Sequence, residues 1–149
     1  MTTGMSNAGE SSVLTLLFQN TNFANAPVIQ GSASAGSFFV SLHTSTGPGQ
    51  AGTQSTNEAA YTGYARVAVA RSSGGWTITG SNPTTAENAA AITFAISTSG
   101  PESETLAALG QATSGAGEVY FIITLTATLV VNNGITPSFA IDALTVTLQ

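Results

Sequence analysis

The sequence predicts a mainly β fold, an antiparallel β-sandwich or jelly roll with a short N-terminal α-helix. Three observations support this fold class. Apolar and polar residues alternate with a period of two in most segments after Gly36, these segments are rich in threonine and valine, and turns with glycine or proline separate them. The pattern predicts about seven short strands.

The length of 149 residues fits one ordinary domain with a sizeable core. Composition does not change along the chain in a way that would indicate a second domain, and no internal repeat is evident. We therefore expect an N-terminal arm with the helix in residues 1–30 and a single β-sandwich domain in residues 31–149.

Residues 7–23 are the helical candidate because Val13, Leu16 and Leu17 have helical spacing. Asn7 or Ser11 is the expected N-cap, since both residue types can accept a hydrogen bond from a free backbone N–H group. An acidic residue in the first turn, Glu10, would interact favourably with the helix dipole.

The first strands follow from alternation. In "SFFVSLHT", Phe38, Val40 and Leu42 point to one face of a half-buried strand. A polar loop at 44–60 leads to "GYARVAVAR", which "SSGG" is expected to join to "WTITG" as a β-hairpin.

The later strands are predicted with less uniform patterns. "AAITFAIST" reads as a strand, and "PESETLAALG" is compatible with a helix or a strand, of which we favour the strand. "EVYFIITLTATLVV" is interrupted by threonines and is expected to form a pair of strands. A turn at "NNG" and the segment "PSFAIDALTVTLQ" then close the domain.

Composition excludes several classes of protein. Charged residues are 6% of the chain against a usual ~25%, and the formal net charge of −5 argues against binding nucleic acid. The absence of cysteine excludes disulfides and thiolate metal sites, and no cofactor or metal is expected. No segment has the pattern of a secretion signal or a membrane-spanning helix, so we expect no membrane association.

Candidate catalytic groups are few. His43 and Asp142 would be needed for a Ser–His–Asp arrangement, but no G-x-S-x-G motif is present, and a hydrogen-bonded strand histidine is the favoured interpretation of His43. Glu102 and Glu104 lie on one face of the predicted strand, where they suit either acid–base chemistry or solubility. We favour solubility for this pair and expect no enzyme.

The candidate interface residues are Arg66, Arg71, Tyr64 and Trp76, which lie close together in sequence. Because these arginines are the only two cationic residues, we expect each to pair with Glu58, with Glu87 or with a carboxylate of a neighbouring subunit. The aromatic rings have two open roles: Trp76 closes the end of the core, or both rings stack on a sugar or a partner side chain.

These segments resemble small virion structural proteins of tailed double-stranded DNA bacteriophages, such as decoration and tail-fibre proteins. The resemblance covers most of the chain from Val13 onward, and the segment 61–80 is its most specific part. Relatives carry Asp-Pro-Gly after "LHT", whereas residues 45–49 here read "STGPG". The other segments that carry the resemblance are "FFVSLHT", "AAITF", "SGAGEVYF" and "NNGITPSFAIDALTVT".

The resemblance implies an antiparallel β domain without enzymatic activity. A capsid decoration protein is the favoured function, with the major capsid protein and copies of itself, as a trimer or dimer, as expected partners. The expected location is the capsid surface of the virion, after synthesis in the bacterial cytoplasm. The alternative is a tail, collar or fibre-attachment component, with host-glycan binding as a further option.

Overall fold

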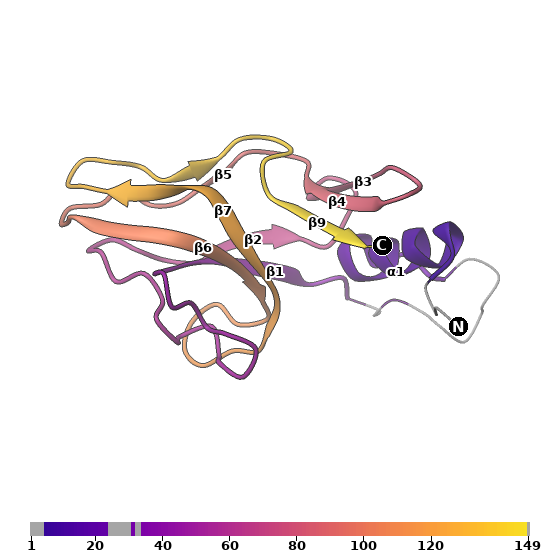
Figure 1. Cartoon of the computed structure of the whole chain (residues 1–149), viewed down its shortest axis with the longest axis horizontal. Coiled ribbons are helices and arrows are strands. Elements are labelled where there is room, and N and C mark those ends of the chain that lie inside the picture. Colours follow the sequence, from indigo (N-terminus) through magenta and orange to yellow (C-terminus); the bar gives the residue numbers. More distant parts are fainter. Residues whose placement is uncertain (1–4, 24–30, 32–33, 149) are drawn as a thin grey trace. The chain divides into compact units, whose positions relative to one another are not determined.

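The chain is mainly β, with one short helix and antiparallel sheets (Figure 1). The computed structural model describes residues 5–23, 31 and 34–148. The described residues cluster into two compact units. The helix unit comprises the described parts of Met1–Gly36, Ala70–Ala91 and Ala140–Gln149, and the sheet unit comprises Ser37–Val69 and Ile92–Phe139. The expected boundary between residues 30 and 31 falls beside undescribed residues and stays a prediction.

The helix α1 (Asn7–Gln19) confirms the helical candidate and is shorter than residues 7–23. Ser6, rather than Asn7 or Ser11, is the N-cap, because its hydroxyl accepts a hydrogen bond from the N–H of Gly9 at 3.2 Å. The helix ends at Asn20, whose left-handed conformation places its N–H on the carbonyl of Thr15. The cap residues therefore set the length of α1.

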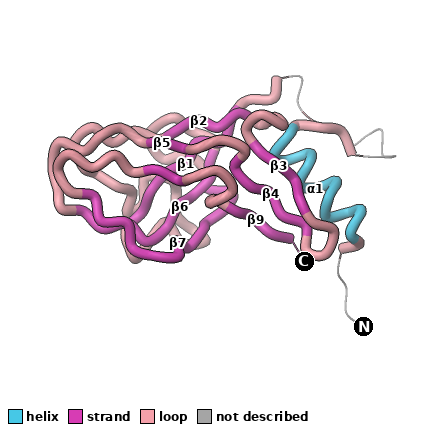
Figure 2. The backbone as a smooth tube through the Cα atoms, turned by 90° about the horizontal axis from the view of Figure 1, so that it is seen from above, coloured by secondary structure: helices cyan, strands magenta, loops and turns pink. Residues whose placement is uncertain are grey.

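The helix unit packs α1 against a three-stranded sheet with the order β3-β4-β9 (Figure 2). Leu14 and Phe18 of α1 are fully buried, and the Phe18 ring meets the Trp76 ring edge to face at 4.8 Å. Leu144 and Val146 contribute to the core of this unit from the C-terminal side. The strands are β3 (Trp76–Thr79), β4 (Thr84–Asn88) and β9 (Thr145–Leu148).

The sheet unit contains a four-stranded sheet with the order β2-β1-β6-β7 and a separate pair of short strands, β5 and β8. β6 pairs antiparallel with both β1 and β7, so it lies inside the sheet, whereas β7 lies at its edge. The four strands of the sheet are β1 (Ser37–His43), β2 (Val67–Ala70), β6 (Glu102–Gly110) and β7 (Val119–Val131). The short strands are β5 (Ile92–Thr93) and β8 (Ser138–Phe139).

The core of the sheet unit is formed by β1, β6 and the aromatic residues near β5. Val40 and Leu42 are fully buried on β1, as the alternation predicted, and Leu109 is fully buried on β6. Phe94 is buried and contacts the ring of Phe139 edge to face at 6.1 Å, which ties β5 to β8. The strand interpretation of "PESETLAALG" is confirmed, because residues 102–110 form β6.

Two strand predictions were wrong. The expected hairpin around "SSGG" does not form, because β2 pairs in the sheet of β1 while β3 pairs with β4. Ser72 starts a tight turn instead, with its carbonyl accepting from Gly75 and Trp76, and the buried Trp76 belongs to the helix-unit core. The expected strand pair at 118–131 is the single strand β7 with 13 residues, in which residues 125–128 bulge opposite Thr105.

Candidate functional site

Arg66 belongs to a buried ion pair within the sheet unit. Its guanidinium forms two parallel hydrogen bonds to Glu58, Nε to Oε1 at 2.6 Å and Nη2 to Oε2 at 2.7 Å. Further bonds from the guanidinium reach the carbonyls of Ala112 at 2.9 Å and Gly115 at 2.7 Å. The Arg66 side chain is only 2% exposed, and the bond to Glu58 raises its pKa. Of the partners that the sequence analysis expected for Arg66, Glu58 is the one that binds it.

Tyr64 extends the same network from the other side of Glu58. Its hydroxyl donates to Glu58 Oε1 at 2.9 Å and accepts from the N–H of Leu42 at 3.0 Å. The ring stacks on Phe94 and meets Tyr61 edge to face. Burial raises the pKa of the Tyr64 hydroxyl, so it stays protonated at neutral pH. The network therefore joins β1 to the loop residue Glu58 and to the start of β2.

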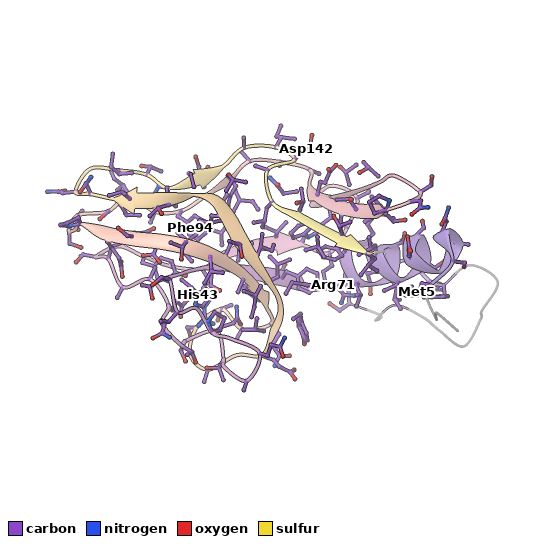
Figure 3. All side chains as sticks on the ribbon, viewed as in Figure 1. Met5, His43, Arg71, Phe94 and Asp142 are labelled. Carbon is purple, nitrogen blue, oxygen red and sulfur yellow. The ribbon has the colours of Figure 1, made fainter. Side chains whose placement is uncertain are left out.

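His43 has the structural role that the sequence analysis favoured. The side chain is labelled in Figure 3. It is fully buried, with Nε2 at 2.8 Å from the Ser41 hydroxyl and Nδ1 at 3.1 Å from the Thr56 carbonyl. Burial lowers its pKa, so the ring is neutral at pH 7. Asp142 occupies a turn in the helix unit, with φ of 60°, and is not among the hydrogen-bond partners of His43. In the described part of the chain, His43 and Asp142 therefore do not form a Ser–His–Asp triad.

Arg71 binds the C-terminal end of α1 within the helix unit. Its guanidinium donates to the carbonyls of Leu17, Leu16 at 2.9 Å and Ala35 at 3.1 Å. The last carbonyls of a helix have no partner inside the helix and carry its negative dipole end, so a cation is favourable there. Arg71 thus fixes the helix to the segment that precedes β3.

Arg71→Met is expected to lower the free energy of unfolding by about 2 kcal/mol, because the helix end loses its charged donor. Chemical denaturation followed by the helical circular dichroism signal measures this change. Arg71→Lys is the matched variant: it keeps the charge but not the fork of donors, and is expected to recover part of the loss. A change below about 0.5 kcal/mol for Arg71→Met would contradict this role.

Trp76 is fully buried in the helix unit, which agrees with the core interpretation of this residue. Its backbone carbonyl accepts a hydrogen bond from the side-chain amide of Gln19 at 2.8 Å, so the C-terminal turn of α1 is attached to β3. A sugar could not stack on the Trp76 ring without exposing it. Trp76 therefore offers no exposed ring for binding a host glycan.

Glu102 and Glu104 differ sharply in environment although they share one face of β6. The Glu102 carboxylate accepts the N–H of Ala60 at 3.0 Å and borders a groove of about 270 Å³. Glu104 is fully buried, and neither of its carboxylate oxygens has a hydrogen-bond partner among the described residues. The solubility role expected for the pair is therefore wrong for Glu104. The groove is lined by Ala60, Tyr61, Ser99, Gly100, Pro101 and Glu102.

Burial raises the pKa of Glu104 to about 7, and the nearby charge of Glu102 adds to this effect. Tyr61 lies beside the two carboxyl groups, and burial together with their charges raises its pKa to about 12. Within the described residues, no three His, Asp or Glu side chains gather as metal ligands. The described residues also form no helix that is long and apolar enough to span a lipid bilayer.

The four predicted interface residues fall into two pairs. Tyr64 and Arg66 lie in the sheet unit, whereas Arg71 and Trp76 lie in the helix unit. All four make contacts inside their own unit, and a role at an interface with another protein stays a prediction. Sequence reasoning missed the burial of Glu104, for which the local pattern "ESETL" carries no signal.

The chain is thus mainly β, and both of its arginines bind groups within their own unit. The chain belongs to a family of bacteriophage fibre proteins: the family model described as Podophage GP4 fiber I protein gp80 matches residues 4–147. A search of curated proteins finds no match. The resemblance to small phage structural proteins is thereby confirmed, and the family indicates a location in the virion.

Proposed function

We propose that the chain is a non-enzymatic structural subunit of a phage fibre or of the attachment between fibre and tail. The observation that carries this proposal is the match of the fibre family to residues 4–147, nearly the whole chain. This finding supports the tail, collar or fibre-attachment alternative better than capsid decoration, which was the favoured expectation.

The chemistry of the described residues is compatible with this role. The cationic side chains Arg66 and Arg71 hold loops and the helix end in place, and His43 is buried and neutral. Such groups stabilise a fold and leave few charges for moving protons or binding an ionic substrate. The proposed partners are neighbouring fibre or tail proteins of the same virion and further copies of the chain.

The test is to locate the chain in purified particles of the phage that encodes it. Immunogold labelling and fractionation of heads from tails are expected to place the chain with tails and fibres, in tens of copies or fewer. Labelling spread over the capsid surface, with hundreds of copies retained on tailless heads, would support decoration and contradict the fibre role. Free tails without the chain would also contradict it.

A further inference from the structure

The strand β7 has an unpaired outer edge in the described part of the chain. It runs for 13 residues and pairs only with β6. An edge strand presents N–H and C=O groups that can pair with another strand. On the inner side of β7, residues 125–128 lie across a bulge from Thr105 of β6. Since the other described edge strands have four residues or fewer, β7 carries the longest such row.

β7 lacks the side chains that usually prevent an edge strand from pairing with a strand of another molecule. Proteins protect exposed edges with charged residues, especially lysine, or with proline. No charged residue lies between Glu118 and Asp142, the chain contains no lysine, and no proline lies within β7. The bulge is the protective feature that this strand does have, and the register with β6 is regular from Phe121 to Thr124.

Apolar side chains are exposed along the same strand. Tyr120 and Val130 are each 48% exposed, and Ile122 is 39% exposed. The intervening residues Phe121 and Ile123 are half-buried, so both faces of β7 keep apolar surface in contact with water. A strand with an open edge and apolar faces gains from pairing through main-chain hydrogen bonds and through side-chain burial.

This edge is the place where charge opposes a second copy of the chain least. The formal net charge is −5, and both arginines already bind internal groups, so the remaining charged surface is acidic. Two copies repel each other through their acidic surfaces, and this repulsion is weakest where neither copy carries charge. The segment 119–141 is the longest uncharged surface segment from which a strand edge is presented.

The sequence of β7 also matches itself in the reverse direction. It reads "VYFIITLTATLVV", which is nearly symmetric about Leu125. Antiparallel pairing of β7 with its copy would therefore place most apolar residues opposite apolar residues and threonine opposite threonine near the centre, the cross-strand pairs that stabilise sheets. Such pairs are Thr124 with Thr126, Phe121 with Leu129 and Val119 with Val131.

We propose that β7 pairs antiparallel with β7 of a second copy around a twofold axis near Leu125, which joins two four-stranded sheets into one. Such an interface is self-complementary, as a twofold axis requires. Each chain has one such edge, so the product is a dimer. The proposal concerns the isolated chain and does not depend on where the chain lies in the virion.

The first experiment measures the molar mass of the full chain by light scattering at about 1–100 µM, a range chosen to span micromolar affinity. The wild type is expected to have the mass of two chains, and Ile122→Lys the mass of one, because it places like charges at the paired edges. Ile141→Lys is the matched control, since Ile141 is 59% exposed and lies in the helix unit; it is expected to remain a dimer.

A second experiment covers the case in which a lysine disturbs folding. The chain has no cysteine, so Leu125→Cys can form a disulfide only between copies, and residue 125 would face itself across the axis. Mild oxidation is expected to convert Leu125→Cys to a covalent dimer and to leave Ile141→Cys unlinked. A monomeric wild type, a trimer, an Ile122→Lys dimer, or equal crosslinking of both cysteine variants would each overturn the proposal.

Discussion

Arg66→Met is expected to lower the free energy of unfolding of the sheet unit by about 3–5 kcal/mol, the usual effect of removing one partner from a buried ion pair. Methionine fills much of the arginine volume but donates no hydrogen bond. Among the described residues, the Glu58 carboxylate would then keep the Tyr64 hydroxyl as its partner. The Ala112 carbonyl would lose the Arg66 donor, whereas the Gly115 carbonyl would keep the N–H of Gly117. Urea denaturation measures the change.

A double-mutant cycle separates the lost pair from the Glu58 charge that is left behind. Glu58→Gln removes that charge, so the double variant with Arg66→Met is expected to be less destabilised than the sum of the two single changes, by about 1–3 kcal/mol. If the two effects simply add, the Arg66–Glu58 pair does not stabilise the fold as described. The lost carbonyl contacts would then account for the effect of Arg66→Met.

The role of Arg66 also answers a question that the sequence leaves open. Its position within the predicted strand "GYARVAVAR" indicated an ion pair but not which carboxylate would bind it. Glu58 was available from sequence, yet its selection depends on the isolated bridge between His43 and Glu58, which holds the loop before β2 against the end of β1. That contact joins residues that are distant in sequence, so the local alternation of polar and apolar residues does not predict it.

Local patterns predicted the elements that local physics determines. Both α1 and β1 form where the sequence predicted them, but their buried sides differ from the prediction. The buried apolar residues of α1 are Leu14 and Phe18 instead of the three that the spacing singled out, and β1 is buried on both faces, because Ser41 and His43 are buried as well. The N-cap was predicted one residue too late, at Asn7 or beyond, because Ser6, Asn7 and Ser11 all have capping side chains. Only the backbone conformation distinguishes Ser6 from the other two.

Partner choice between strands was less predictable. "SSGG" between two alternating segments is a good hairpin signal, but β2 and β3 join different sheets. The deciding contacts are tertiary: Trp76 is buried against Phe18 in the helix unit, and the N–H of Arg71 bonds to the carbonyl of Gly36. Burial of one large aromatic side chain outweighs the small preference of a turn sequence.

The burial of Glu104 has the same kind of origin. In sequence, residues 102–105 are all polar, and an exposed face of the strand would accommodate both glutamates. In the structure the register with β7 shifts between Glu104 and Leu106, and the four residues 107–110 are all buried. A bulge is set by the pairing of two strands, so the sequence of β6 alone does not reveal it.

Glu104→Gln is expected to make the stability of the chain much less dependent on pH between about 4.5 and 8. The pKa of Glu104 is raised from 4.5 to about 7 in the folded chain. Below pH 4.5 the carboxyl is largely protonated whether the chain is folded or unfolded, so it costs little. As pH rises toward 7 the unfolded chain releases this proton more readily, so the wild type loses stability, by about 3 kcal/mol in total.

The measurement is urea denaturation of wild type and Glu104→Gln at about pH 4.5, 6 and 8. The difference between the two proteins is expected to grow by about 3 kcal/mol in favour of the variant from the lowest to the highest pH. Glu118→Gln, at an exposed position of the same unit, makes the same change in net charge and should show no such growth. Parallel curves for Glu104→Gln and wild type would mean that the Glu104 carboxyl titrates normally.

An independent readout of the same charge is the ionisation of Tyr61. Burial is the largest cause of the raised Tyr61 pKa, and the charges of Glu102 and Glu104 raise it further. Removing the Glu104 charge is therefore expected to lower the Tyr61 pKa. Ultraviolet titration of the folded protein follows this change, and Glu118→Gln again serves as the control. Tyr61 ionises far above the pKa of Glu104, so the Glu104 carboxylate is charged while Tyr61 titrates. The titration therefore reports the proximity of the two groups in the folded protein. It remains informative if one unit unfolds before the other and the stability curves are no longer two-state.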